Sequence, residues 1–533
     1  MGALIVGDFP RLHARRDGVA IAYIDGTTHL TWQQVDERVN RLCHGLRKSY
    51  GIAAGDRIAI LSQNCHEYAE LMFAASRLAA IYTGLNTRHH PTEMAQQIRD
   101  SGSKLLILGP GFETVGAELV AKAGVYSLTL GTSPGGYESL LATSAVTDIP
   151  SHGDENAPYT LTYTSGTTGE PKGAIISSRN EVGFCQSMAW AAETRHDDRA
   201  ILVLPMFHKG GQFCIMHPAY FGLTTVILPN PEPNAMLAAI EQHRPSFGVL
   251  VPTVMKMMID AMANDDNRQR DLSSLRHYMY GSNPITLPVL RQFTKLFSCT
   301  MSQIGGIGTE GGVALVLSRV DHQQAMADPA LEQRLTSCGR VQPGFEMMLV
   351  DEEDRPVVMG ERGEMLFRGD AFISGYWQRP EASARLWRGG WLRSGDIGRI
   401  DAEGFVYYVD RKAGRIKTGA ETVYAREVEA VLRESPLVGE VVVVGVPDET
   451  WGEAVWACVE RSIGVIASSD SEDEQCIQRF VRERMAGFKV PKRILFVEQL
   501  PRTALGKLAI GEVRSLLFER NSQGKESPSL EST

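Results

Sequence analysis

The most informative stretch of the 533-residue chain is residues 163–173, which read YTSGTTGEPKG. This stretch holds three glycines, four serine or threonine hydroxyls and one lysine, Lys172. Successive backbone N–H groups and hydroxyls in such a loop can surround phosphate oxygens, and the lysine adds a positive charge. The Walker pattern G-x-x-x-x-G-K-[ST] does not fit, because Pro171 stands where its last glycine should be and Gly173 follows the lysine. The stretch therefore predicts a phosphate-binding loop of a different kind.

Short apolar runs alternate with amphipathic segments around this loop. Thr31 and Gln34 form a capping-box pattern before a helical run of apolar residues. Helices are also expected over 67–81 and 234–242. Strands are expected over 58–61, 104–108, 201–204, 225–228 and 248–251. The alternation predicts an α/β fold whose mostly parallel sheets are covered by helices.

The sequence pattern changes twice in the second half of the chain. Residues 339–409 contain short runs with many glycines and turn signals, which predict a small β-rich subdomain at the end of a large domain over 1–409. After a hinge at 410–413, residues 414–520 predict a smaller α+β domain. Its expected elements are helices over 427–433 and 476–485 and strands over 441–444 and 494–497. The tail, 521–533, is polar and expected to be disordered.

Composition excludes several classes of protein. The chain has 54 basic and 63 acidic residues, a net charge of −9, which argues against a nucleic-acid partner. It lacks an apolar run long enough for a membrane span or a signal peptide. Its eight cysteines form no C-x-x-C pair, and a chain of this length can bury its cores without disulfides. We therefore expect a cytoplasmic protein with reduced thiols.

Further motifs follow the loop in a fixed order. The motifs are LPMFH at 204–208, Thr309-Glu310, Gly363-Glu364, Gly375-Tyr376-Trp377, WLRSGD at 391–396, Asp410-Arg411-Lys412 and PRTALGK at 501–507.

With these motifs, nearly the whole chain resembles the adenylate-forming superfamily of acyl- and aryl-CoA synthetases, beetle luciferases and peptide-synthetase adenylation domains. The resemblance implies an ATP-dependent carboxylic acid–CoA ligase, with Mg²⁺ as cofactor and coenzyme A as co-substrate. The acid and ATP give acyl-AMP and pyrophosphate, and the thiol of CoA then displaces AMP. The resemblance also implies that the small domain is mobile and rotates about the hinge between the two half-reactions.

Site residues are carried over from the matching motifs. The implied nucleotide contacts are Thr164, Ser165, Gly166, Thr167, Thr168, Gly169, Lys172, Gly281, Ser282, Thr309, Asp396 and Arg411. Asp396, expected in a polar turn, would accept hydrogen bonds from both ribose hydroxyls, and Arg411 would contact ribose or phosphate. Glu310, with Thr164 as a helper, would bind Mg²⁺.

The resemblance assigns the remaining roles to residues near the acid and the thiol. Lys507 would be the catalytic lysine that reaches the acyl carboxylate and the α-phosphate. His208 would gate the acyl pocket and orient the carboxylate, in a pocket formed by Phe207, His208, Gly305 and Gly306. Lys417 and Gly419 are candidates for contact with CoA.

The chain departs from the family pattern at several positions. Gly306 and Ile307 stand where an aromatic residue usually stacks on adenine, so Tyr280 or Ile307 is expected to cover the base. Residues 306–311 also fit G-x-G-x-x-G, a weak dinucleotide pattern that the Thr-Glu motif absorbs. The other departures are Ala413 in the hinge and Ala420 and Thr422 in the loop after Lys417.

The acid is expected to be bulky and largely apolar, because Gly305 and Gly306 leave room beside the adenine site. The expected apolar walls are Met206, Phe207, Phe213 and Met216. A long chain, an aromatic ring and a fused polycyclic acid all stay open, and so does the use of the glycine pair for a tight turn. Three other functions stay open: loading of a carrier-protein phosphopantetheine, a luciferase-like oxidation, and nucleotide binding without catalysis. Assembly as a homodimer also stays open.

Overall fold

The computed structural model describes residues 4–151, 154–165, 171–264, 270–281, 285–411, 415–419, 421–462, 469–501 and 510–523. The chain divides into two compact units. Unit one comprises Met1–Thr87, Met94–Thr164 and Lys172–Asp410, and unit two comprises Arg88–Glu93, Ser165–Pro171 and Arg411–Thr533.

The largest sheet of unit one has the strand order β15-β14-β13-β12-β11-β9-β10-β1-β2. The pairs from β13 through to β1 are parallel, whereas β14, β15 and β2 add antiparallel edges. Its strands are β1 Ile21–Asp25, β2 Thr28–Thr31, β9 Arg199–Leu202, β10 Thr224–Ile227, β11 Phe247–Leu250, β12 His277–Gly281, β13 Thr300–Gly306, β14 Val313–Leu317 and β15 Arg340–Val341.

A second sheet of unit one has the order β6-β5-β3-β4-β7-β8, and its pairs from β6 to β7 are parallel. Its last two strands flank the phosphate-loop sequence. The strands are β3 Arg57–Leu61, β4 Ile81–Gly84, β5 Ser103–Leu108, β6 Tyr126–Thr129, β7 Pro158–Ser165 and β8 Pro171–Ser177.

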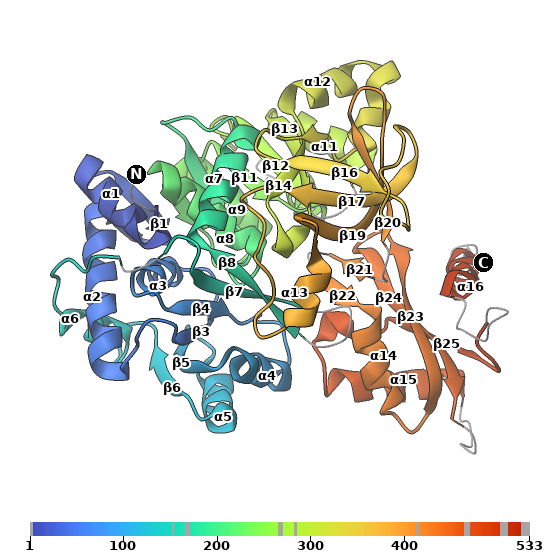
Figure 1. Ribbon diagram of the computed structural model, residues 1–533, viewed down its shortest axis with the longest axis horizontal. Coiled ribbons are helices and arrows are strands. Elements are labelled where there is room, and N and C mark those ends of the chain that lie inside the picture. Colours follow the sequence, from blue (N-terminus) through green and yellow to red (C-terminus); the bar gives the residue numbers. More distant parts are fainter. Residues whose placement is uncertain are drawn as a thin grey trace. The chain divides into compact units, whose positions relative to one another are not determined.

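Helices cover both of these sheets (Figure 1). Helices α7 and α8 pack against each other, and both approach strands of the largest sheet. The helices are η1 Val6–Asp8, α1 Phe9–Asp17, α2 Trp32–Tyr50, α3 His66–Arg77, α4 Pro91–Ser101, α5 Glu113–Ala123, α6 Tyr137–Ala142, α7 Ser178–Ala192, α8 Lys209–Phe221, α9 Pro233–His243, α10 Pro252–Asn264, α11 Leu287–Phe297, η2 Gly308–Glu310, α12 Arg319–Ala327, η3 Pro329–Thr336 and α13 Pro380–Leu386. The predicted α/β class is confirmed.

The third sheet of unit one is antiparallel, with the order β16-β17-β19-β18 and with β20 paired to β19. It occupies the part of the sequence that predicted a β-rich subdomain. Its strands are β16 Glu346–Val350, β17 Arg362–Arg368, β18 Trp387–Arg388, β19 Trp391–Ile400 and β20 Val406–Arg411.

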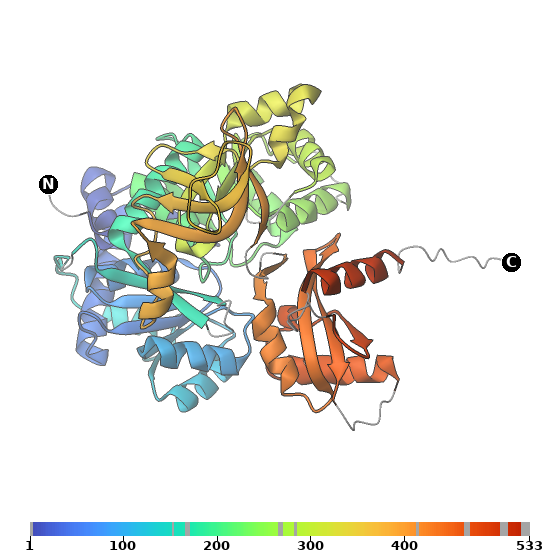
Figure 2. The same cartoon turned by 45° about the vertical axis from the view of Figure 1, so that its right-hand side comes forward.

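Unit two, mostly orange to red in Figure 2, is built on a sheet. The strand order is β22-β21-β24-β23, with β25 paired to β24. Alternate residues of β23 point to opposite faces of the sheet. Val441 and Val443 join a core with α14 and α15, whereas Val442 and Val444 join a second core with α16. The elements are β21 Arg415–Thr418, β22 Glu421–Tyr424, β23 Val438–Asp448, β24 Gly452–Arg461, β25 Arg493–Val497, α14 Ala425–Arg433, α15 Asp470–Arg482, η4 Gly487–Lys489 and α16 Ile510–Gln523.

The predicted elements agree with the structure except at several ends. The capping box at Thr31 is present, with both reciprocal bonds formed, at the start of α2. The helix expected over 67–81 ends at Arg77, because Ala79 takes a positive φ of 53° and Ile81 begins β4. The helix expected over 476–485 begins earlier, at Asp470, where Ser469 forms a capping box with Glu472. Helix α16 extends to Gln523, three residues into the expected tail, and residues 524–533 lie outside the described part.

All eight cysteines are free thiols. Across the described residues, no helix has both the length and the apolar character that crossing a membrane requires.

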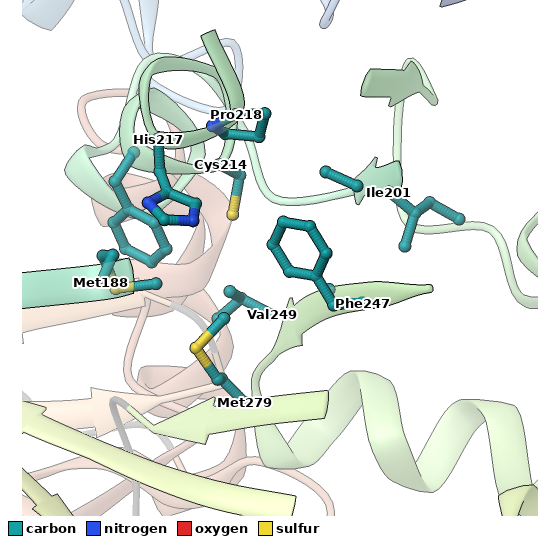
Figure 3. Close-up of a pocket in the computed structure, with 11 residues that line it drawn as sticks. Met188, Ile201, Cys214, His217, Pro218, Phe247, Val249 and Met279 are labelled. Carbon is teal, nitrogen blue, oxygen red and sulfur yellow. The ribbon is translucent and has the colours of Figure 1, made fainter. Parts of the chain in front are cut away.

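A small apolar pocket lies between α7, α8 and the largest sheet (Figure 3). Its free volume of about 10 Å³ is room for roughly one water molecule. Phe213, expected to line an acyl pocket, borders this small space. His217 also borders it, with Nδ1 3.0 Å from Cys185 O and Nε2 3.0 Å from Thr194 Oγ1. Neutral imidazole satisfies both contacts by donating to the carbonyl and accepting from the hydroxyl.

Buried His217 should make the protein less stable in mild acid. Burial lowers the pKa of His217 from 6.5 to about 4, although the Cys185 carbonyl and Asp198 act to raise it. At a pH between the two pKa values, the histidine of the unfolded chain is protonated and that of the folded chain is not. The free energy of unfolding therefore falls as the pH falls through this range. We expect His217 to account for about 2 kcal/mol of the free energy of unfolding lost between pH 7 and pH 5.

Urea denaturation at the two pH values measures this loss. His217→Gln should reduce the pH dependence by that amount, whereas the exposed-site variant His196→Gln should leave it unchanged. The same pH dependence in His217→Gln and the parent would contradict a neutral buried imidazole.

Candidate active site

Lys172, Tyr376 and Glu310 lie together at strand β8. The Lys172 ammonium is 5.6 Å from the centroid of the Tyr376 ring, where the ring face attracts a cation. The Tyr376 hydroxyl donates a 2.9 Å hydrogen bond to Glu310 Oε1. One tyrosine therefore contacts both the lysine expected at the phosphates and the carboxylate expected at Mg²⁺.

Backbone hydrogen bonds hold this group in place. Ala174 and Tyr376 pair as an antiparallel bridge, in which Ile175 N–H donates to Gly375 O at 2.9 Å. Trp377 N–H donates to Gly173 O at 2.8 Å, completing the attachment of the segment to β8. At its other end, Ile373 N–H donates to Glu310 O at 3.0 Å. Residues 373–377 thus tie β8 to η2, which carries Thr309 and Glu310.

Glu310 has the chemistry expected of a magnesium ligand. Its side chain is buried, with a residue exposure of 3%, so its carboxylate lies in a site shielded from bulk water. Thr164, half-buried, lies next to the last residue of β7. Carboxylate and hydroxyl oxygens suit a hard cation that keeps several waters and bridges phosphates. The donor set therefore fits Mg²⁺.

Strands β7 and β8 fix the two ends of the phosphate-loop sequence. Before the loop, the Tyr163 hydroxyl donates to Asp100 Oδ2 at 2.6 Å, and burial together with this carboxylate raises the Tyr163 pKa. After it, a Cβ on Gly173 would lie 3.1 Å from the Tyr163 ring, a tight contact that favours glycine at this position. Four predicted phosphate contacts lie outside the described residues: Gly166, Thr167, Thr168 and Gly169. Of Ser165, the structure describes only the backbone, at the end of β7.

Asp396 lies in strand β19 and not in the expected turn. The strand has an irregular register opposite β17, and Gly395 within it takes a φ of +66°, which lets the chain bulge there. Asp396 N–H donates to Ser394 Oγ at 3.0 Å, and the residue is 4% exposed. Arg411 is the last residue of β20, with its side chain outside the described part.

Phe207 and His208 end the loop that leads into α8. Their rings are 4.6 Å apart, with Phe207 buried and His208 half-buried. Asn64 holds the loop, since its amide donates to Leu204 O at 3.1 Å and its carbonyl accepts from Met206 N–H at 2.8 Å. His208 is therefore presented from a fixed loop at the start of a helix.

Gly305 and Gly306 have packing reasons for lacking side chains. A Cβ on Gly306 would lie 2.2 Å from Gly312 O, and one on Gly305 would lie 3.3 Å from the Cys338 Cβ. Gly312 directly precedes β14, and the pairing of β13 with β14 shifts register between Gly305 and Gly306. The glycine pair therefore permits close strand packing, not a tight turn, and Gly306→Trp would break that packing whatever acid is bound.

The two side chains expected to cover adenine are both buried. Tyr280 in β12 is fully buried, and its hydroxyl lies 3.3 Å from His322 Nε2. Ile307 is 2% exposed, so neither side chain presents an accessible face to a base. Gly281 ends β12, where a Cβ would lie 2.3 Å from Ile304 O. Ser282 lies outside the described residues.

In unit two, Lys417 and Gly419 frame the turn between β21 and β22. Lys417 N–H donates to Glu453 Oε2 at 2.6 Å, and Gly419 N–H donates to Trp451 O at 2.6 Å. Gly419 takes a φ of +62°, which explains the glycine. Thr422 pairs with Lys417 across the hairpin. Ala413, Ala420 and Lys507 lie outside the described residues.

The sequence motifs assigned no role to three residues of the site region. Tyr376 was present in a matched motif, yet only the fold shows that it joins Lys172 to Glu310. Glu181 and Lys209 form a buried ion pair between α7 and α8. A lysine directly after His208 in a largely apolar helix was the available signal, but its partner Glu181 lies 28 positions earlier in the sequence.

Comparisons with known proteins agree with this arrangement. Residues 11–377 match the family described as AMP-binding enzyme, and residues 427–507 match the AMP-binding enzyme C-terminal domain. A feruloyl-CoA synthase of Amycolatopsis sp is 34% identical over 510 residues, covering 96% of this chain and 98% of that protein. A long-chain-fatty-acid–CoA ligase of Mycobacterium tuberculosis is 32% identical, covering 91% and 93% of the two chains.

A solved structure shows the same fold over nearly the whole chain. The amide bond synthetase McbA from Marinactinospora thermotolerans superposes with a TM-score of 0.84 at 29% identity. The match covers 96% of this chain and 99% of the other.

Proposed function

The chain belongs to the AMP-binding enzyme family, and from that membership we propose how its residues activate a carboxylic acid. It is an AMP-forming acid–thiol ligase that uses ATP, Mg²⁺ and CoA. We propose that its acid is bulky and largely apolar. The observation that carries the ligase mechanism is the joining of Lys172 and Glu310 through Tyr376. The bulky acid is supported by the acids named for two relatives, a feruloyl-CoA synthase and a long-chain-fatty-acid–CoA ligase.

In the first half-reaction a carboxylate oxygen of the acid attacks the α-phosphorus of ATP. The new O–P bond forms as the bond to pyrophosphate breaks, so negative charge moves onto the leaving group. Lys172, held at the face of Tyr376, is placed to offset charge on the phosphates. Glu310 and Thr164 would hold Mg²⁺, which when bound neutralises phosphate charge.

In the second half-reaction the sulfur of CoA attacks the acyl carbon of acyl-AMP. The C–S bond forms, the bond to AMP breaks, and the thiol proton is released.

His208, presented at the start of α8, would orient the acyl carboxylate in the first half-reaction and admit the acyl group. Lys507 would act in the first half-reaction, and Lys417 and Gly419 would contact CoA in the second. A rotation at 410–413 would separate the two steps.

The nucleotide would be held by the remaining predicted contacts. Asp396 would accept hydrogen bonds from the ribose hydroxyls, with Arg411 beside ribose or phosphate. Thr309 in η2 and Gly281 at the end of β12 would contact the nucleotide. We also propose that the protein acts in the cytoplasm, which its eight free cysteines support.

Acid-dependent ATP–pyrophosphate exchange tests the first half-reaction. Release of AMP that depends on both acid and CoA tests the second. A panel of acetate, hexanoate, benzoate, palmitate and a steroid-type acid measures the preference by kcat/KM. Exchange with none of these acids would contradict the ligase activity, and a clear preference for acetate would contradict the bulky acid.

Replacing Asp396 by alanine should raise the KM for ATP by about tenfold or more, because two hydrogen bonds to a charged acceptor are lost. Steady-state kinetics with varied ATP measures this effect. Asp370→Ala, at a surface carboxylate that is 68% exposed, is the matched control and should leave the KM unchanged. An unaltered KM in Asp396→Ala would remove this residue from the nucleotide site.

A further inference from the structure

Helices α7 and α8 share a buried ion pair that the proposed reaction does not use. Lys209 Nζ lies 2.5 Å from Glu181 Oε2, and the two side chains are 8% and 0% exposed. Tyr159 on β7 donates its hydroxyl to the same Glu181 oxygen at 2.7 Å. Burying an ion pair carries a large desolvation cost, so packing alone is a weak reason for one.

The pair is surrounded by aromatic side chains. The Lys209 ammonium lies 4.7 Å from the centroid of the Phe184 ring, and Phe184 stacks on Phe213 with centroids 5.2 Å apart. Burial, together with the Glu181 carboxylate, raises the pKa of Tyr159 well above its ordinary value, so Tyr159 stays a donor. The surroundings therefore combine flat apolar faces with one charged pair.

Two polar atoms on the same two helices lack a hydrogen-bond partner among the described residues. They are Glu181 Oε1, an acceptor, and Gln212 Nε2, a donor, both on fully buried residues. Gln212 is fixed through its other amide atom, since Thr162 donates to Gln212 Oε1 at 3.0 Å. Gln212 lies three positions after Lys209, on the same face of α8. Unmet buried donors and acceptors are costly, so they indicate a partner that arrives from outside.

The position of the pair connects it to the acid. Lys209 directly follows His208, which the proposed function places beside the acyl group. We propose, resting on that function, that Lys209, Glu181 and Gln212 bind a hydroxyl group on the body of the acid. The hydroxyl would donate to Glu181 Oε1 and accept from Lys209 Nζ or Gln212 Nε2. The enzyme then selects an aromatic acid that bears a hydroxyl over the same acid without it.

Charge explains why the group is a hydroxyl and not a second carboxylate. Glu181 already balances Lys209, so a further buried anion would face one carboxylate with no cation left to offset it. A neutral hydroxyl is both donor and acceptor, which matches one unmet acceptor and one unmet donor. A purely apolar group would leave both atoms unsatisfied.

Matched acid pairs test the proposal in ATP–pyrophosphate exchange. The pairs are 4-hydroxybenzoate with benzoate and 4-hydroxycinnamate with cinnamate. The parent enzyme should favour the hydroxylated member of at least one pair by about tenfold or more in kcat/KM. In Glu181→Gln, which removes the charged acceptor, that preference should fall below about threefold.

A second variant keeps the proposal testable if Glu181→Gln fails to fold because it leaves Lys209 buried without an anionic partner. The double variant Lys209→Met with Glu181→Leu removes the whole ion pair and should also lose the preference. Glu70→Gln is the matched control, because buried Glu70 likewise accepts from a cation, Arg38, and from a tyrosine, Tyr137. It should keep the parent's preference.

The outcomes separate this proposal from the ligase activity. Exchange with these acids but no hydroxyl preference in the parent would overturn the hydroxyl site alone. A preference that survives in the double variant would also overturn it. Exchange with no acid of the panel would overturn the ligase activity and the hydroxyl site together.

Discussion

Replacing Lys507 by alanine should lower acid-dependent ATP–pyrophosphate exchange by about a hundredfold to a thousandfold, as expected when a preorganised positive charge at the reacting group is lost. Thioester formation from supplied acyl-AMP and CoA should change far less. The reason is that charge develops on the phosphates only in the first half-reaction, and Lys507 is expected to act there.

The two half-reactions can be assayed separately on the same preparation. Lys492→Ala, at an exposed lysine of unit two whose ammonium lies over Trp451, is the matched control and should leave exchange unchanged. Equal loss of both half-reactions in Lys507→Ala would contradict a role confined to adenylation.

Replacing Glu310 by glutamine should lower exchange by about a hundredfold or more and raise the Mg²⁺ concentration required for half-maximal rate. The amide keeps the shape of the side chain, and its oxygen can still accept from the Tyr376 hydroxyl. The variant therefore removes the negative charge while retaining the packing of a buried residue.

Titration of activity with Mg²⁺ distinguishes a metal ligand from a structural residue. Tyr376→Phe, which removes the hydrogen bond but keeps the charge of Glu310, should lower the rate less and shift the Mg²⁺ requirement less. A large loss of rate in Glu310→Gln with an unchanged Mg²⁺ requirement would show that Glu310 does not bind the metal.

Much of the fold was predictable because local patterns agree with the tertiary structure. The capping box at Thr31 and the alternation of strands and helices depend on nearby residues alone. The helix over 67–81 was predicted too long, because its apolar spacing continues past Ala79, whose positive φ comes from the turn into β4. Asp396 was predicted in a turn because the bulge at Gly395 gives this part of β19 the residue composition of a turn.

The site was predictable only where its residues lie in contiguous motifs. Lys172 and Glu310 stand in such motifs, and the fold brings both of them to Tyr376. Glu181 and Lys209 meet only because α7 and α8 pack together, and no short-range pattern records that contact. The close packing at Gly306 could not be read from the sequence either, because it depends on the backbone carbonyl of Gly312, which approaches only in the folded sheet.

The backbone ties between β8 and residues 373–377 affect the thermodynamics of nucleotide binding. These hydrogen bonds form when the chain folds, so the entropy of ordering Lys172 beside Tyr376 and Glu310 is lost at that stage. ATP then meets a group already in position, and less of its interaction energy is consumed in immobilising side chains. Binding at this group should therefore show a smaller opposing entropy than binding at segments that become ordered only around the ligand.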